Sequence, residues 1–289
     1  MAISRIAVLG AGLMGHGIAQ VAAQVAKSDV YLMDSRQEFL DRGLRMIDGS
    51  LERFVRKGEL SPDELINTKN RIHATLSLRE AVRRADVVIE ATPEDARLKR
   101  SLFSEVDKMA SEHTIIVSNT SSISITLLAR ATKRPERFCG MHFFNPPQVM
   151  KLVEIVRGVK TSDETIQVIK ELAGRMGKDP VIVKKDVPGF VVNRILVPAL
   201  NEAILLVQKG VASPTDIDKA VKLGLNWPMG PLMLADFIGL DTTLAMAKTI
   251  ATGTDGSKLQ INPLLKKMVK AGTLGKKTGK GFFDWPEKK

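Results

Sequence analysis

The chain has 289 residues, of which 44 % are hydrophobic and 26 % are charged, a composition typical of a soluble globular protein with one or two domains. Its net charge of +11 favours anionic partners, but aromatic residues make up only 4 %, which argues against a platform that stacks single-stranded nucleic acid. Cys139 is the only cysteine, so a disulfide within the chain and a multi-cysteine metal site are excluded.

The same features indicate where the protein works. A lone cysteine is typical of a reducing compartment, so we expect a cytoplasmic protein. The chain opens directly on a strand pattern, and we therefore expect no targeting peptide. The most apolar stretch, Phe190–Val207, contains Asn193, Arg194 and Glu202, which indicates a buried helix rather than a membrane span. We expect neither a membrane nor a nucleic-acid partner, and no metal.

Strand and helix patterns alternate through the first part of the chain. Short apolar runs predict buried strands at Ile3–Leu9, Val30–Met33, Asp86–Ala91, Thr114–Asn119, Arg137–Phe144, Lys151–Val156 and Pro180–Val183. Helical periodicity covers Leu13–Val25, Gln37–Lys57, Pro62–Asn70 and Leu98–Met109. This alternation predicts an α/β domain over residues 1–185, with a parallel, doubly wound sheet and a helical insertion at about 37–70.

From Val187 onward the sequence shows only helix patterns. The candidates are Val191–Lys209, Pro214–Leu223, Leu232–Ile250 and Pro263–Ala271. We therefore predict an all-helical C-terminal domain over residues 186–289. Its two most apolar stretches exceed what so small a domain can cover, and apolar surface of this kind marks obligate interfaces. The expected assembly is a homodimer formed through this domain.

A glycine motif lies between the first strand and the first helix. The segment has the form G-x-G-x-x-G and consists of Gly10, Ala11, Gly12, Leu13, Met14 and Gly15. In this setting it predicts a Rossmann-type site that binds a dinucleotide, with the pyrophosphate at the helix N-terminus. Asp34, at the end of the second strand, can accept ribose hydroxyls and repel a 2′-phosphate, which favours NAD over NADP. Arg36 weakens this preference, because a nearby arginine can accommodate that phosphate.

Two titratable residues fall on neighbouring strands after this motif. His142 lies near the end of one predicted strand, and Glu154 lies in the next. A histidine is a natural acceptor for a hydroxyl proton, and a carboxylate on its other nitrogen can stabilise the imidazolium. The spacing alone also allows a structural role for both.

The sequence resembles the L-3-hydroxyacyl-CoA dehydrogenase family, including its 3-hydroxybutyryl-CoA dehydrogenases, along essentially the whole chain. The matching segments are GAGLMGHGIAQ at 10–20, SNTSS at 118–122, HFFNPP at 142–147, VMKLVEIV at 149–156, DVPGFVVNRIL at 186–196, GPLMLADFIGLDTT at 230–243 and GKKTGKGFF at 275–283. The resemblance implies NAD-dependent oxidation of a short-chain (S)-3-hydroxyacyl-CoA, and the reverse reduction.

The resemblance also implies roles for individual residues. His142 would be the general base with Glu154 as its partner, and Ser121 and Asn193 would hydrogen-bond the substrate oxygen. The positions that match cofactor contacts are Glu94, Lys99, Asn119, Asn145 and Lys277. Ser50 and Lys57, in the helical insertion, match CoA contacts, where a lysine suits the phosphates.

Three other functions stay open at this point. A dehydrogenase of a free hydroxy acid, of the L-gulonate type, would use the same chemistry without CoA. A non-catalytic NAD-binding protein would not need His142 and Glu154. A nucleic-acid binder is supported only by the net charge, because no basic recognition helix accompanies it.

Overall fold

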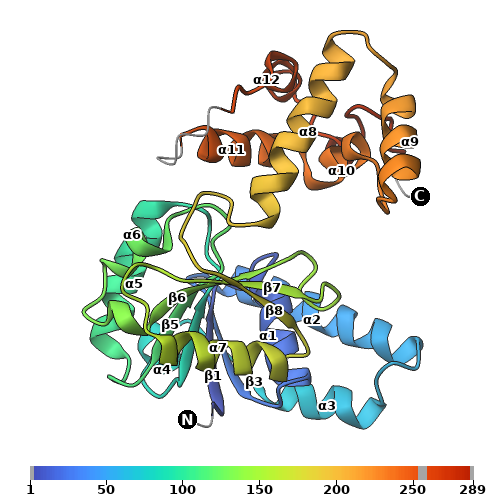
Figure 1. Ribbon diagram of the computed structural model, residues 1–289. Coiled ribbons are helices and arrows are strands. Elements are labelled where there is room, and N and C mark those ends of the chain that lie inside the picture. Colours follow the sequence, from blue (N-terminus) through green and yellow to red (C-terminus); the bar gives the residue numbers. More distant parts are fainter. Residues whose placement is uncertain (1–2, 253–258, 287–289) are drawn as a thin grey trace. The chain divides into compact units, whose positions relative to one another are not determined.

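The computed structural model describes residues 3–252 and 259–286 (Figure 1). The chain divides into two compact units, Met1–Asp186 and Val187–Lys289. Within the described residues, no helix combines the length and the apolar character needed to cross a membrane.

The first unit is built on one sheet of eight strands in the order β3-β2-β1-β4-β5-β6-β7-β8. The strands are β1 (Arg5–Leu9), β2 (Asp29–Met33), β3 (Ile72–Thr75), β4 (Val87–Glu90), β5 (Ile115–Ser118), β6 (Phe138–Phe143), β7 (Leu152–Val156) and β8 (Asp179–Val183). All neighbouring pairs are parallel except β6 and β7, which are antiparallel. The sheet is therefore mixed, which corrects the expectation of a purely parallel one.

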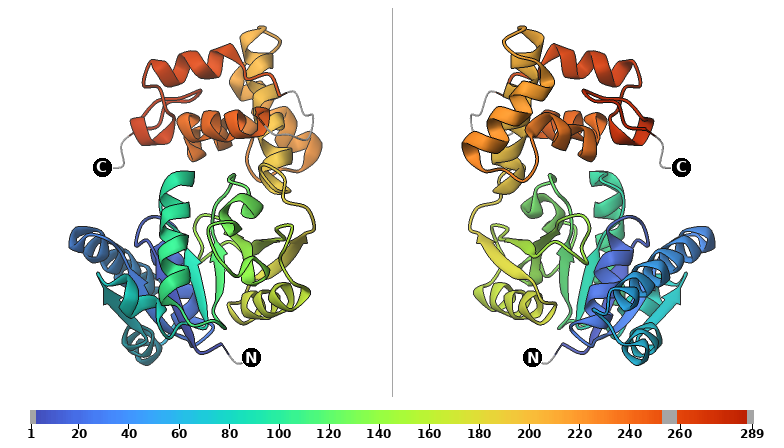
Figure 2. Two further views of the ribbon diagram at one scale, coloured as in Figure 1. Left: turned by 90° about the vertical axis from the view of Figure 1, so that its left-hand side faces the viewer. Right: turned by 90° about the vertical axis from the view of Figure 1, so that its right-hand side faces the viewer.

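Helices lie on both sides of this sheet (Figures 1 and 2). The helices α1 (Gly15–Gln24) and α7 (Asp163–Arg175) contribute to one core cluster with the strands. The shorter α4 (Leu78–Val82), α5 (Ala96–Met109) and α6 (Ile125–Ala129) contact one another in that order. Strands β1 to β3 follow one another toward one edge of the sheet, and β4 to β6 follow one another toward the other edge. Because parallel crossovers are right-handed, this change of direction places these three helices on the other face of the sheet.

Strand side chains alternate between the two faces, and this alternation determines where polar groups lie. In β6, Cys139 and Met141 belong to the core cluster formed with α1 and α7. His142 therefore points to the opposite face, the one covered by α5 and α6. The same alternation places Glu90, the last residue of β4, and Ser118, the last residue of β5, on that face. The polar side chains near these strand ends therefore lie on the same face of the sheet.

The helices α2 (Gln37–Arg56) and α3 (Pro62–Asn70) follow β2 and correspond to the helical insertion. Ser61 begins α3, since its side chain accepts a hydrogen bond from the Glu64 N–H. The strand β3 comes next and was not predicted. Two of its four residues are exposed, so it carries no continuous apolar run.

The second unit is helical, with α8 (Val192–Gln208), α9 (Pro214–Leu225), α10 (Pro231–Ile238), α11 (Leu240–Ala251) and α12 (Pro263–Lys270). Its core joins residues of each of these helices. The stretch predicted as one helix at Leu232–Ile250 is two, because Gly239 adopts a φ of +103° between α10 and α11. That positive φ is readily available to glycine and ends the first helix.

Candidate active site

The turn between β1 and α1 leaves room for a phosphate group. Gly10 has a φ of +101°, and a Cβ there would lie 2.7 Å from the carbonyl oxygen of Ala91. A Cβ on Gly15 would lie 1.7 Å from the carbonyl oxygen of Gly10, so both positions require glycine. At Gly12 a Cβ would meet nothing within 4 Å. The backbone is therefore open at Gly12, beside the N-terminus of α1, where a pyrophosphate would fit.

Asp34 follows β2 and is tied to this turn. Its Oδ2 accepts a hydrogen bond from the Ala11 N–H at 2.8 Å, and its Oδ1 accepts one from the Ser35 N–H at 2.7 Å. Each carboxylate oxygen has a further lone pair, so ribose hydroxyls can still bind. Arg36 has its guanidinium 3.3 Å from Glu38, with both side chains about two-thirds exposed. These residues fit NAD, because a carboxylate at the end of β2 can accept ribose hydroxyls and would repel a 2′-phosphate.

His142 and Glu154 form a buried pair across β6 and β7. The strand register places the two residues directly opposite each other. Nδ1 of His142 lies 2.8 Å from Oε2 of Glu154, and their side chains are 7 % and 0 % exposed. The Phe144 ring lies against the imidazole, with 4.6 Å between ring centroids. This pair has the geometry in which a carboxylate fixes the tautomer and orientation of an imidazole.

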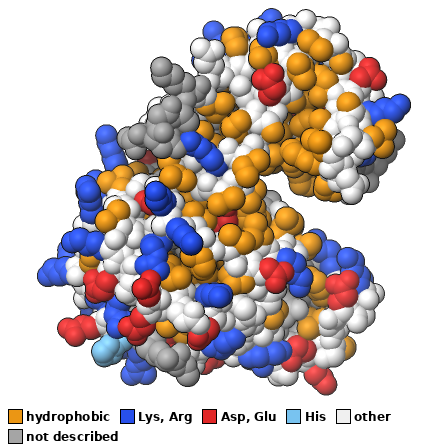
Figure 3. Space-filling view, in the orientation of Figure 1, with side chains coloured by type: hydrophobic (Ala, Val, Ile, Leu, Met, Phe, Trp, Pro, Cys, Tyr) orange, Lys and Arg blue, Asp and Glu red, His pale blue; other side chains and the backbone are white. Residues whose placement is uncertain are grey.

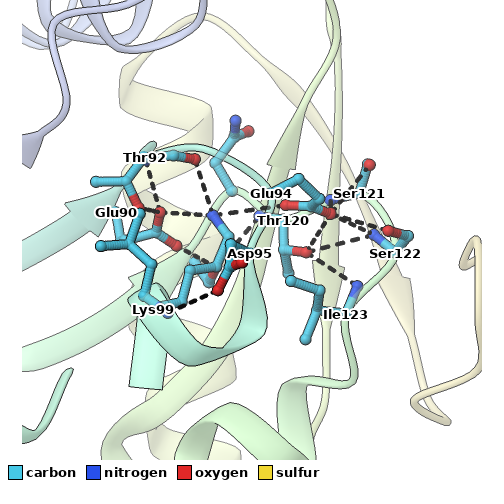
Figure 4. A network of polar contacts seen from close by, with 12 residues as sticks. Glu90, Thr92, Glu94, Asp95, Lys99, Thr120, Ser121, Ser122 and Ile123 are labelled. Atoms are coloured by element: carbon cyan, nitrogen blue, oxygen red, sulfur yellow. Dashed lines mark hydrogen bonds and ion pairs between the residues drawn. The ribbon is translucent and has the colours of Figure 1, made fainter. Parts of the chain in front are cut away.

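Ser121 and Asn119 lie in the loop that follows β5. The Oδ1 atom of Asn119 accepts a hydrogen bond from the Phe143 N–H at 2.8 Å. Asn119 therefore holds the end of the strand that carries His142. The Ser121 hydroxyl donates to Oε1 of Glu94 at 3.3 Å (Figure 4). The structure thus brings Ser121 and Glu94 together, and links Asn119 to the His142 strand.

Lys99, on α5, is not a surface cation. Its side chain is 1 % exposed, and Nζ donates to Oε1 of Glu90 at 2.6 Å and to the carbonyl of Thr92 at 3.1 Å. The Ser118 hydroxyl donates to the other oxygen of Glu90 at 2.6 Å. Sequence reasoning missed Glu90 and Ser118, together with Thr120 and Ser122. The available signal was the glutamate at the end of the apolar run VVIE. A fully buried charge requires a partner, so this residue predicts a polar network around it.

The remaining predicted residues lie elsewhere in the two units. Leu13 is exposed and Met14 half-buried in the turn before α1, and Asn145 follows β6. Ser50 is buried on α2, and Lys57 is exposed at the end of that helix. In the helical unit, Asn193 is 8 % exposed at the start of α8. Lys277 donates to both carboxylate oxygens of Asp241 at 2.5 Å.

The chain is similar to known proteins along nearly its whole length. The family model for the NAD binding domain of 3-hydroxyacyl-CoA dehydrogenase matches residues 5–187, and the model for the C-terminal domain of the same family matches residues 189–285. A probable 3-hydroxybutyryl-CoA dehydrogenase of Deinococcus radiodurans is 50 % identical over 281 residues, which cover 97 % of this chain and 100 % of the relative. Another, from Bacillus subtilis, is 49 % identical over 288 residues, covering 100 % and 99 %.

A solved structure is similar along the same length. The crystal structure of an (S)-3-hydroxybutyryl-CoA dehydrogenase from Ralstonia eutropha has a TM-score of 0.94 and 43 % identity, and the match covers 99 % of this chain and 100 % of that one. The fold class, a Rossmann-type sheet with a helical C-terminal part, is confirmed. Fold and family matches together define an NAD-binding oxidoreductase. The chain belongs to the 3-hydroxyacyl-CoA dehydrogenase family.

Proposed function

We propose that this protein oxidises (S)-3-hydroxybutyryl-CoA, or a closely similar short-chain (S)-3-hydroxyacyl-CoA, to the 3-oxoacyl-CoA, and also catalyses the reverse reduction. The observation that carries the proposal is the buried His142–Glu154 pair, in the same unit as the NAD-binding turn. The substrate class is supported by the relatives named above, which match over nearly their whole length.

In the proposed reaction His142 acts as the general base. The Glu154 carboxylate accepts a hydrogen bond from the Nδ1–H group of His142, so Nε2 is the nitrogen that takes the proton of the 3-hydroxyl and returns it in the reduction. The Glu154 carboxylate stabilises the imidazolium that forms, and its burial strengthens this interaction. Bound NAD supplies the nicotinamide ring to which the hydride is transferred. Ser121 and Asn193 align the substrate oxygen by hydrogen bonds.

Further residues are proposed to hold the two ligands. The turn Gly10–Gly15 and Asp34 bind the adenine-nucleotide half of NAD. Other cofactor contacts are proposed for Asn119, Asn145 and Lys277. Ser50 and Lys57, on α2 and at its end, are proposed to contact CoA. The cytoplasm is the proposed compartment, in keeping with a single cysteine that is buried.

The test of this function follows NADH absorbance with acetoacetyl-CoA as substrate. We expect turnover that depends on acetoacetyl-CoA and oxidation of the (S) but not the (R) isomer of 3-hydroxybutyryl-CoA. Free acetoacetate and L-gulonate are assayed separately as alternative substrates. Equal turnover of a free acid would favour the hydroxy-acid dehydrogenase, and NADH binding without any turnover would favour a non-catalytic protein.

Replacement of Asp34 by serine should weaken NADH binding and narrow the preference over NADPH. The substitution removes a charge-assisted acceptor for the ribose, so the KM for NADH should rise about tenfold or more. It also removes the repulsion of a 2′-phosphate. The measurement is kcat/KM with both cofactors. Asp29→Ser, at the other end of β2, is the matched control, and a wild-type preference for NADPH would contradict the assignment.

We further propose a homodimer formed through the helical unit. Large apolar side chains remain exposed on its helices, including Ile195 (65 %), Leu223 (76 %), Leu225 (64 %) and Phe237 (50 %). Figure 3 shows that hydrophobic side chains gather over a broad face of this unit. Light scattering at micromolar concentration should give the mass of two chains. A stable and active monomer at that concentration would refute the interface.

A further inference from the structure

One oxygen of Glu94 is the shared acceptor for the loop after β5. Oε1 accepts hydrogen bonds from the Thr120 hydroxyl at 2.6 Å and the Ser122 hydroxyl at 2.9 Å. It also accepts from the backbone N–H groups of Ser121 at 3.0 Å and Ser122 at 3.1 Å (Figure 4). The conformation of three consecutive residues is therefore tied to a single carboxylate.

The Ser121 hydroxyl reaches the same oxygen, but it makes the weakest of these contacts. Its distance to Oε1 is 3.3 Å, the longest among the three hydroxyls. A carboxylate oxygen has about two lone-pair sites, so five donors cannot all bind it well. A hydroxyl has only one proton to donate. The Ser121 hydroxyl can therefore donate its hydrogen bond to a substrate oxygen instead of to Glu94, while Thr120 and Ser122 continue to hold the loop.

Glu94 is held in turn by a buried ion pair. Nζ of Lys99 lies 3.5 Å from Oε2 of Glu94, the oxygen that does not bind the loop. The same ammonium is fixed by Glu90 at 2.6 Å, and both of these side chains are at most 1 % exposed. Glu90 also accepts from the Thr92 N–H and the Thr92 hydroxyl, each at 2.6 Å. Lys99 is thus a rigid cation aimed at one side of Glu94.

These surroundings keep Glu94 ionised. Burial raises the pKa of its carboxyl, but the charge of Lys99 and the hydrogen bonds from Thr120, Ser122 and Ser121 outweigh this effect and hold the pKa below its ordinary value. A neutral carboxylic acid would need to donate its own proton and would compete with the loop donors. The anionic form, which accepts only, suits a group that collects several donors.

We propose that Glu94, fixed by the buried Glu90–Lys99 pair, is a positioning residue that sets Ser121 against the substrate oxygen. The proposal rests on the proposed function, because Ser121 is given its substrate contact there. In this proposal Glu94 and Lys99 act on the loop rather than on the cofactor. They hold the loop and leave the Ser121 hydroxyl available for the substrate.

The kinetic test compares Glu94→Gln, Ser121→Ala and the double variant. Glu94→Gln removes the charge and should lower kcat for acetoacetyl-CoA about ten- to a hundredfold, as expected when a reacting group is displaced. The NADH dissociation constant, measured by fluorescence, should change little. In the Ser121→Ala background, Glu94→Gln should have almost no further effect on kcat, because both substitutions remove one function.

The neighbouring Asp95 provides the matched control. It begins α5 by accepting from the N–H groups of Arg97 and Leu98, and Asp95→Asn keeps that cap while making the same change in charge. Its kcat should equal that of wild type. The proposal is overturned if Glu94→Gln and Ser121→Ala multiply in the double variant, or if Glu94→Gln acts only on NADH binding. Glu94 would then be a direct cofactor contact.

A second measurement does not depend on catalysis. Hydrogen–deuterium exchange, followed by mass spectrometry on a peptide that covers residues 119–123, reports how firmly the loop is held. Glu94→Gln should speed exchange in this peptide, and Asp95→Asn should not. Unchanged exchange in Glu94→Gln would overturn the proposal even if the enzyme is active. If wild type fails to reduce acetoacetyl-CoA, the proposed function falls, and the exchange result alone decides whether Glu94 holds the loop.

Discussion

His142→Ala and Glu154→Gln should each lower kcat for acetoacetyl-CoA about 10²–10⁴-fold, the usual contribution of a general acid–base group. Alanine removes the group that gives the proton to the forming hydroxyl. Glutamine keeps the shape of Glu154 but not its charge, so the imidazolium loses its counter-ion and the tautomer is no longer fixed. NADH affinity should stay close to that of wild type, since neither residue lies in the turn at Gly10–Gly15.

The double variant should be little worse than His142→Ala, because the two residues act as one unit. Glu112 and His113, two consecutive exposed residues before β5, provide the controls. Glu112→Gln and His113→Ala should be fully active. The decisive value is kcat for Glu154→Gln. If it lies within about threefold of wild type, the pair is structural and the base must be another residue.

Lys99→Met should destabilise the protein by about 3–5 kcal/mol, because it leaves the buried Glu90 without its partner charge. The side chain of Glu90 is 0 % exposed, so water cannot compensate for the lost ammonium. Chemical denaturation should show a lower midpoint with an unchanged slope, which reports a change in stability rather than in the surface exposed on unfolding.

Adding Glu90→Gln to Lys99→Met should restore much of that loss. The neutral amide no longer needs a cation: its oxygen can accept the hydrogen bond from the Thr92 N–H, and its NH2 group can donate to the Ser118 hydroxyl oxygen. Lys108→Met, an exposed position on the same helix, should change stability by about 0.5 kcal/mol or less. A double variant as unstable as Lys99→Met would mean that packing of the lysine stem, and not the charge of Glu90, determines the loss.

The sequence predicted most of the sheet because seven of its strands are apolar runs. It missed β3, whose place in the sheet depends on pairing with β2 rather than on its own burial. It also predicted α10 and α11 as one helix, since apolar residues continue across Gly239 and local periodicity does not report a backbone φ. The direction of β7 depends on how the chain returns after Asn145, which no periodicity encodes.

The residues of the candidate site could be predicted where they lie in recognisable sequence motifs. The turn at Gly10–Gly15 and the His142–Glu154 pair came from local pattern and from resemblance. The network around Glu94 could not be predicted from spacing, because its donors lie 26 to 28 residues away in the sequence. The same holds for Asn119, whose hydrogen bond to the Phe143 N–H forms only when β5 and β6 pair. Residue type shows what such groups can bind, but tertiary structure selects the partner.

The facing positions of His142 and Glu154 on antiparallel strands affect how this family can vary. The connection from Phe144 to Lys151 can change in length or composition without moving the pair, because the pairing of the strands fixes it. An insertion of one residue inside β7, before Glu154, would instead turn the carboxylate to the opposite face of the sheet, among the apolar side chains that contact α1 and α7. The part of the loop that follows Asn145 can therefore change in length, whereas the length of each strand is fixed by the chemistry that it carries.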